Sequence, residues 1–228
     1  MNDLAQNLIE ELQCETVFTI PILGGIPVSE AVVVTWIIMA VLVAVSFILT
    51  RNLKVDHISK RQAVAESIVT GLMKMVQGMV GEKGKAYVPY LTTVMLYIGV
   101  SNIIGLFGFK SPTKDLRVTV ALALMSIILI EAAGIYHKGV KRWLHGFVEP
   151  VAIVTPINIL EVVTKPLSLC MRLFGNVLGA FVIMELLKMI LPVGLPVVFS
   201  LYFDIFDGLL QAYVFVFLTS LYIDEITE

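Results

Sequence analysis

Long runs of apolar residues, separated by short polar stretches, dominate the pattern of this chain. A helix needs about 20 mainly apolar residues to cross the hydrocarbon core of a bilayer. Three runs have about that length, and they cover residues 28–50, 88–107 and 116–136. Two longer runs follow, at 158–191 and 195–226. The pattern therefore predicts an all-α membrane protein with about five transmembrane segments.

The last two runs are longer than a straight crossing requires. Each exceeds 30 residues, or about 45 Å of helix, whereas the hydrocarbon core is about 30 Å thick. Helices of this length must tilt strongly, kink or lie partly in the membrane plane, and Pro166 can supply a kink. A short turn at 192–196 joins the two runs. We therefore expect residues 156–228 to form a long, tilted helical hairpin.

The segment 57–85 has a different pattern. Charged residues alternate with apolar ones, and Val64, Ile68 and Leu72 recur at helical spacing. This pattern is typical of an amphipathic helix on the membrane surface; a linker helix of the soluble type is the alternative. Residues 1–26 have no basic stretch ahead of an apolar one, which argues against a cleavable signal peptide. We expect them to form an outer N-terminal segment of one integral-membrane domain, residues 1–228.

The composition agrees with a membrane protein and excludes several function classes. Hydrophobic residues make up 58% of the 228 residues and charged residues 15%, against about 25% charged in a soluble domain. The net charge of −2 gives no reason to expect a nucleic-acid partner. The two cysteines, Cys14 and Cys170, predict no disulfide framework. No phosphate loop, nucleophile–base motif or metal-ligand spacing occurs in the sequence, so we expect neither a stand-alone enzyme nor a bound cofactor.

The distribution of basic residues orients the five segments, because cytoplasmic loops carry the excess of lysine and arginine. One side holds ten of them and the other side four. The ten are Arg51, Lys54, Lys60, Arg61, Lys74, Lys83, Lys85, Lys138, Lys141 and Arg142, and the four are Lys110, Lys114, Arg117 and Lys188. We expect the N-terminus outside and the C-terminus in the cytoplasm.

A charged residue lies inside the fourth run. Placing Arg172 near the bilayer centre costs about 2.5–3.5 kcal/mol on insertion scales, and arginine does not avoid this cost by losing its proton. Such a group requires a polar cavity, an ion path or a partner charge. The structural alternative is an internal ion pair that only holds helices together. Its candidate partners are Asp204, Asp207, Glu131 and Glu161.

Polar and small residues form a stripe on each of the last two runs. On the fifth run Asp204, Asp207 and Gln211 follow one another at steps of three and four, which places them on one helix face. Helices joined by a short turn are antiparallel neighbours, so we expect Arg172 and Gln211 at similar depth. The stripe on the fourth run has the same spacing and comprises Glu161, Lys165, Ser168, Arg172, Asn176 and Gly179.

Four further polar residues allow two interpretations each. Asn102 belongs to an ion path or is a hydrogen-bonding residue between helices. Glu131 belongs to the path or is a packed, protonated carboxyl. Glu161 and Lys165 belong to the path or are charged residues at the membrane border, because they lie near the expected cytoplasmic end of the fourth run. At that border Lys165 can extend its charge to the membrane surface.

Three stretches of the sequence form distinct motifs. They are residues 166–176, Pro-Leu-Ser-Leu-Cys-Met-Arg-Leu-Phe-Gly-Asn, residues 210–219, Leu-Gln-Ala-Tyr-Val-Phe-Val-Phe-Leu-Thr, and Ser111-Pro-Thr-x-Asp115 followed by Val118-Thr119. In this order they resemble the signature, the last-helix motif and the outer-loop motif of one family, subunit a of the F-type ATP synthase membrane sector, in its bacterial form. The resemblance covers nearly the whole chain, including the five segments and the surface helix.

This resemblance implies an ion-conducting stator subunit in the bacterial plasma membrane. Its partners would be a ring of c subunits, subunit b of the peripheral stalk and the rest of the ATP synthase. The chain would supply two offset half-channels for H⁺, or for Na⁺ if the c subunits provide sodium ligands. Arg172 would be the essential arginine facing the ring. Asn176 and Gln211 would line the outer half-channel, and Glu161 would belong to the inner one.

The chain departs from the family pattern at two positions. Many members carry an acid nine residues after the arginine, where this chain has Phe181, and a histidine seven before the glutamine, where it has Asp204. We therefore expect Asp204 to be the outer proton relay and to share one cavity with position 181. Asp207 and Asp115 are the next candidates.

Two rival functions remain open at this point. Arg172 could bind an anionic substrate in a secondary carrier, although such carriers usually contain inverted repeats and none is evident. The chain could also be a non-transporting scaffold of a membrane complex.

Overall fold

The computed structural model describes residues 16–21, 26–51, 59–107, 109, 111–148, 154–190 and 199–227. Within these ranges five helical segments are long and apolar enough to cross a membrane, as the apolar runs predict. They contain the helices α2 (Glu30–Thr50), α4 (Val88–Ile103), α5 (Leu116–Lys138), α7 (Thr155–Ile190) and α9 (Gly208–Thr227).

Two of these helices change their geometry at one end. A 3₁₀ turn, η2 (Ile104–Phe107), continues α4, and a π-helix, η5 (Leu201–Asp207), precedes α9. The fifth run is therefore not the uniform α-helix over 195–226 that its length suggests. The expected turn at 192–196 lies outside the described residues. α7 continues as one helix through Pro166.

The expected surface helix is shorter than its sequence pattern. α3 covers Lys60–Gln77, and a separate 3₁₀ helix, η1 (Glu82–Tyr87), follows. The Ser59 hydroxyl accepts a hydrogen bond from the backbone N–H of Gln62 at 3.3 Å, which caps the start of α3. Val64 and Ile68 are exposed and Leu72 is half-buried, so the described parts of the chain leave most of this apolar stripe uncovered. An uncovered stripe favours the membrane-surface interpretation over a soluble linker.

The residues before α2 contain a hairpin that the sequence analysis did not predict. β1 (Thr16–Ile20) pairs antiparallel with β2 (Ile26–Ser29). Between α5 and α7, the basic connector contains a short helix, α6 (Val140–Gly146). Gly139 lies between α5 and α6 with φ +78°, a backbone conformation that glycine adopts without steric cost.

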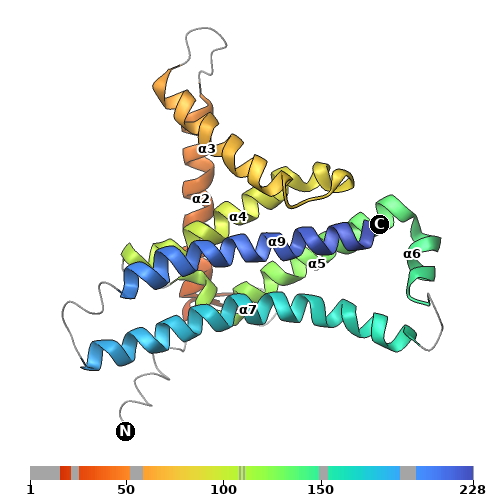
Figure 1. Cartoon of the computed structure of the whole chain (residues 1–228). Helices are drawn as coiled ribbons and strands as arrows, with labels where there is room; N and C mark the ends of the chain where they lie inside the picture. The colour runs from red at the N-terminus through yellow and green to blue at the C-terminus, as the bar shows by residue number, and fades with distance from the viewer. Residues whose placement is uncertain are drawn as a thin grey trace, which may run out of the picture.

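α7 and α9 run side by side in opposite directions, and α5 contacts both of them (Figure 1). α4 packs against the other side of α9. In the view of Figure 1, α2 runs across the direction of this group and α3 projects from it. The hairpin of long helices expected from the sequence is therefore present, with α4 and α5 as its support.

The core lies among α4, α5, α7 and α9. One cluster of buried residues joins all four helices and includes Ile98, Leu122, Leu173 and Phe215. α4 and α9 approach closely at Gly208, where an added Cβ would meet the Cβ of Asn102 at 2.8 Å. Because lipid is as apolar as leucine, such close packing and internal hydrogen bonds hold membrane helices together.

Contacts at the two ends of the bundle sort the loops into two groups. At one end the Ser29 hydroxyl bonds the Asp115 carboxylate, and Asn102 meets the start of α9. At the other end Gly81 lies against Asp224, beside the C-terminus of α9. Lys114 and Arg117 belong to the first end, and Lys85 and Lys138 to the second. The count of basic residues on the two sides of the membrane assumed the same separation for these four residues.

Candidate functional site

Arg172 lies on the face of α7 that the bundle does not cover. Leu169, Cys170 and Leu173 are buried in the core, whereas Arg172 itself is exposed. The predicted polar stripe has the same orientation, because Glu161, Ser168, Arg172 and Asn176 are all exposed. In a membrane, an exposed charge at this position would meet lipid unless water or a partner protein covers it. The stripe is thus a surface that requires something outside the chain.

The ion-pair explanation of Arg172 is not supported. Within the described part of the chain, the Arg172 guanidinium forms no ion pair and no hydrogen bond. Glu161 lies instead 3.7 Å from the Lys165 ammonium, and the Glu131 carboxylate accepts a hydrogen bond from the Trp143 indole at 2.9 Å. The structure therefore does not bring Glu131 to the arginine.

Gln211 faces the interior of the bundle. It is 3% exposed, and the adjacent Ala212 belongs to the core cluster that also contains Leu173. Both helices thus contribute to one core cluster, but Arg172 is exposed and Gln211 is buried. The expected outer-channel residues Asn176 and Gln211 are separated in the same way, one exposed and one buried.

A cavity of about 440 Å³ lies at the end of the bundle that contains the outer-loop motif. It is lined mainly by residues of η2, the 3₁₀ turn η3 (Pro112–Lys114), α7 and η5. The polar and charged side chains in its lining are Asn102, Ser111, Lys114, Glu185, Ser200, Asp204 and Asp207. Phe181 belongs to the same lining, so position 181 and Asp204 share one cavity, as predicted.

Asp204 lies against the backbone of η2. A Cβ added to Gly105 would stand 3.2 Å from the Asp204 carboxylate oxygen, so a side chain at this position would crowd the carboxylate. Asp204 and Asp207 both belong to the π-helical segment η5, and π-turns within helices are frequent at functional sites. The sequence analysis placed Asp204, Asp207 and Gln211 on one helix face by assuming an α-helix throughout, and that assumption fails in η5.

Asn102 has a structural role as well as a place in the cavity. Its side-chain amide donates to the Gly208 carbonyl at 2.9 Å, and its carbonyl oxygen accepts from the Thr113 hydroxyl at 2.7 Å. The Ser111 hydroxyl donates to the Ser101 carbonyl at 2.7 Å. These buried bonds fasten the outer loop to α4 and α9. The sequence analysis named Asn102 as a possible hydrogen-bonding residue between helices, but it gave Ser111 and Thr113 no role beyond the outer-loop motif.

Asp115 is buried next to the cavity, outside its lining. Its carboxylate accepts from the Ser29 hydroxyl at 2.8 Å and from the Arg117 amide at 2.9 Å, and so caps α5. These two bonds give Asp115 a structural function that needs no ion path.

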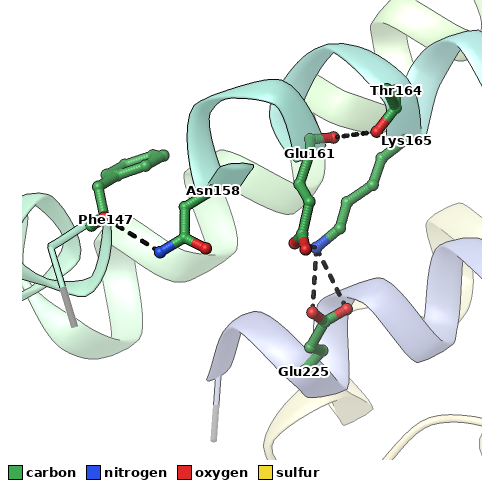
Figure 2. Close-up of polar contacts among 6 residues, drawn as sticks. All are labelled: Phe147, Asn158, Glu161, Thr164, Lys165 and Glu225. Atoms are coloured by element: carbon green, nitrogen blue, oxygen red, sulfur yellow. Dashed lines mark hydrogen bonds and ion pairs between the residues drawn. The ribbon is translucent and has the colours of Figure 1, made fainter. Parts of the chain in front are cut away.

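A second polar group occupies the opposite end of the α7–α9 pair. Figure 2 shows Lys165 of α7 reaching Glu225 of α9, with its ammonium 3.2 Å from both carboxylate oxygens. The Lys165 ammonium also lies 5.2 Å from the centre of the Tyr222 ring. The sequence analysis missed Glu225, because the short acidic C-terminus gave no sign of which carboxylate faces α7.

No group of three or more His, Cys, Asp or Glu side chains in the described part of the chain is placed to hold a metal ion.

Comparison with known proteins identifies the family. A family model described as ATP synthase A chain matches residues 32–224. ATP synthase subunit a of Moorella thermoacetica is 36% identical over 203 residues, covering 88% of this chain and 92% of the relative. ATP synthase subunit a 1 of Crocosphaera subtropica is 30% identical over 87% of this chain and 86% of its own length. A Propionigenium modestum protein named "ATP synthase subunit a, sodium ion specific" is 35% identical over 87% of this chain and 74% of its own length. The chain belongs to the ATP synthase subunit a family.

Proposed function

We propose that this chain is the ion-conducting stator subunit of its ATP synthase, and that Arg172 faces the rotating c-ring. The observation that carries the proposal is the exposed Arg172 on the uncovered face of a membrane helix, where no residue in the described ranges pairs with it. A ring of c subunits against this face would remove the arginine from lipid and give it a carboxyl partner. The chain itself makes or breaks no covalent bond in this mechanism.

Arg172 would act by favouring one charge state of a carboxyl on each c subunit. That carboxyl must be neutral to rotate through lipid, because an ionised group is very costly there. Close to a fixed positive charge, the ionised form is favoured instead. The carboxyl would therefore release its proton near Arg172 and be reloaded before it re-enters lipid. The arginine also prevents a proton from crossing directly between the two access paths.

The cavity is our candidate for the outer half-channel. It contains Asp204 and Asp207, and Asp204 would be the main proton relay. Asn176 and Gln211 would continue the path toward the arginine. The inner half-channel would start near Glu161, where Lys165 and Glu225 form the polar group of Figure 2. Each charge that crosses would release about 2.3 kcal/mol per 100 mV of membrane potential, which would drive rotation.

We propose protons as the coupling ion. The relative from Propionigenium modestum is named sodium ion specific, so sodium is the competing choice within the family. The cavity carboxylates suit proton transfer, because each can hold and release a proton. The subunit b stalk and the remaining subunits would hold the chain still while the ring turns.

Replacing Arg172 tests the proposal. Arg172→Ala should abolish ATP-driven proton pumping in vesicles that contain the assembled complex, because the ring carboxyl loses its counter-charge. Arg172→Lys should restore little, since lysine lacks the planar, five-donor fork of arginine. Met171→Ala, next to Arg172 and exposed but outside the polar stripe, is the control and should still pump. Normal pumping by assembled Arg172→Ala would refute the proposal.

The orientation is tested separately, by labelling single cysteines in a background without Cys14 and Cys170. An impermeant maleimide should label Lys114→Cys and the exposed Arg117→Cys only from outside intact cells. Lys60→Cys and Lys138→Cys should react only in inverted vesicles. The opposite pattern would reverse the proposed topology.

A further inference from the structure

We propose that α6 and the turn after it form a binding site for anionic phospholipids, in which α6 lies in the membrane border and Lys141 and Arg142 bind the phosphate head groups. The partner is a lipid of the surrounding bilayer. The inference requires only that the chain spans a membrane, and it does not depend on ion conduction.

α6 lies beside the end of α5 instead of extending beyond it. The Trp143 indole of α6 donates to the Glu131 carboxylate of α5 at 2.9 Å. Glu131 lies seven residues before Lys138, the last residue of α5, which is about 10 Å of helix. Trp143 also packs at Gly134, where an added Cβ would meet the indole ring at 3.2 Å. α6 is therefore folded back along about the last two turns of a membrane-spanning helix.

The residues around α6 mark this level as the border of the membrane. Tryptophan and tyrosine are enriched at membrane–water interfaces. Trp143 is half-buried, and Tyr136, in the last turn of α5, is 82% exposed. The apolar run of α5 ends at the same level, since His137 and Lys138 follow Tyr136. In the view of Figure 1, α6 leads from the end of α5 toward the start of α7 and runs across the direction of both. This is the orientation of a helix lying in the plane of the interface.

α6 has an apolar side and a basic side. Val140 and Leu144 are one helical turn apart and are 57% and 55% exposed. Lys141 and Arg142 are exposed too, and they lie about 100° and 200° around the helix from Val140. Such a division is typical of helices that place an apolar side among the acyl chains and a basic side among the head groups.

The charge of this segment determines which lipid it fits. Lys138, Lys141, Arg142 and His145 lie close together in residues 138–148, which contain no acidic residue. Within the described part of the chain, neither Lys141 nor Arg142 forms an ion pair. Basic residues at a membrane surface attract anionic lipids, and the arginine fork fits a phosphate group. The exposed apolar side favours a lipid over a free phosphate or an acidic protein surface.

The lipid site is connected to the polar face of α7. The rings of Trp143 and Phe147 meet edge to face with their centres 5.0 Å apart. The Phe147 carbonyl accepts a hydrogen bond from the side chain of Asn158 at 3.0 Å, as Figure 2 shows. Asn158 belongs to the first turn of α7. A lipid that holds α6 in place would therefore also hold the start of α7, close to Glu161 and Lys165.

The test is photo-cross-linking from α6 in the assembled complex. Leu144→Cys, in a background without Cys14 and Cys170, is labelled with benzophenone maleimide. The complex is reconstituted in vesicles that contain equal amounts of phosphatidylglycerol and phosphatidylcholine, with one or the other lipid radiolabelled. Subunit a is separated after illumination, and the two attached lipids are counted.

We expect phosphatidylglycerol to exceed phosphatidylcholine by at least about threefold. Each basic residue near an anionic surface contributes about a fivefold preference, and salt reduces the combined effect of two. Raising the salt to about 0.5 M should therefore move the ratio toward one. Lys141→Gln combined with Arg142→Gln should also bring the ratio to about one. The salt measurement on the unchanged connector decides the question if that variant does not assemble.

Lys60→Gln combined with Arg61→Gln is the matched control. These two residues are exposed at the start of α3, so the variant loses the same charge elsewhere and should keep the wild-type ratio. A ratio near one with the unchanged connector would overturn the inference, as would a ratio that neither salt nor the loss of Lys141 and Arg142 changes. Cross-links to a protein subunit in place of lipid would overturn it too, because a protein would then cover α6.

Discussion

The polar faces of α7 and α9 look alike in sequence and have opposite orientations in the structure. On α7, Ser168, Arg172 and Asn176 are exposed. On α9, Gln211 is 3% exposed and Thr219 is 0% exposed. Both stripes have the helical spacing of three and four residues. Spacing alone therefore identifies a polar face but does not tell whether it meets a partner or the interior.

The difference assigns separate tasks to the two helices. An exposed polar face in a membrane requires a partner outside the chain, whereas a buried one must be satisfied by internal groups or water. In our proposal α7 therefore meets the ring, and the start of α9 delivers protons from inside the subunit. The predictions below test this division.

The largest expected effect is at Asp204. Asp204→Asn should slow passive proton conduction by the membrane sector severely, because an amide in the cavity cannot accept and release a proton as a carboxylate does. Asp207→Asn should cost much less and serves as the matched control in the same π-helix. The measurement is the decay of a valinomycin-driven potential in vesicles. Near-normal conduction by Asp204→Asn would remove α9 from the proton path.

The same experiment contains a rescue. Phe181→Glu in the Asp204→Asn background should recover part of the conduction, since both positions line one cavity. Recovery by Ser168→Glu instead, on the exposed face of α7, would show that the path follows the outer stripe.

A moderate effect is expected at Asn102, in the buried network. Asn102→Leu removes its two hydrogen bonds, to the Gly208 carbonyl and from the Thr113 hydroxyl, each worth about 0.5–1.5 kcal/mol. Less subunit a should remain in the purified complex after mild heating. Ser168→Ala, on the exposed face, should retain wild-type amounts. Equal losses in the two variants would contradict the division into inner and outer faces.

The smallest effect is expected where the two helices meet at Lys165 and Glu225. The side chains are 19% and 52% exposed, and exposed ion pairs contribute about 0–1 kcal/mol. The Lys165 ammonium also lies 3.7 Å from the Glu161 carboxylate, so it keeps one acidic partner when Glu225 is replaced. Glu225→Gln should therefore shift the heat resistance of the complex only slightly. A loss as large as that of Asn102→Leu would mean that this pair is a main fastening of α7 to α9.

The sequence predicted the membrane segments well because a 20-residue apolar run has few alternative structures. It also identified the arginine, the stripe around it and the shared cavity of Asp204 and position 181. The boundaries of α3 were less predictable, since charged residues continue past Gln77 into η1. The hairpin of β1 and β2 was missed, because its two strands are only five and four residues long.

The remaining errors share a physical cause. Whether a polar residue faces inward depends on which side of its helix meets the bundle, and that is decided by packing between distant segments. The two interpretations of Glu131 stay predictions, but its bond to Trp143 could not be predicted from the sequence. Glu225 was not considered, although it reaches across to Lys165. Lys114 was counted only as an outer positive charge, and its approach to Phe181 required the fold.

The π-helix η5 makes this subunit sensitive to the length of its chain. A π-turn contains about one more residue than an α-turn, so η5 behaves like a one-residue insertion ahead of α9. Deleting one residue between Leu201 and Phe203 would let the segment relax to an α-helix, which turns about 100° per residue. The carboxylates of Asp204 and Asp207 would then rotate relative to Gln211 and Ala212, whose places are fixed by the core. This subunit should therefore tolerate substitutions in η5 better than deletions, because a deletion changes the direction in which the two carboxylates point.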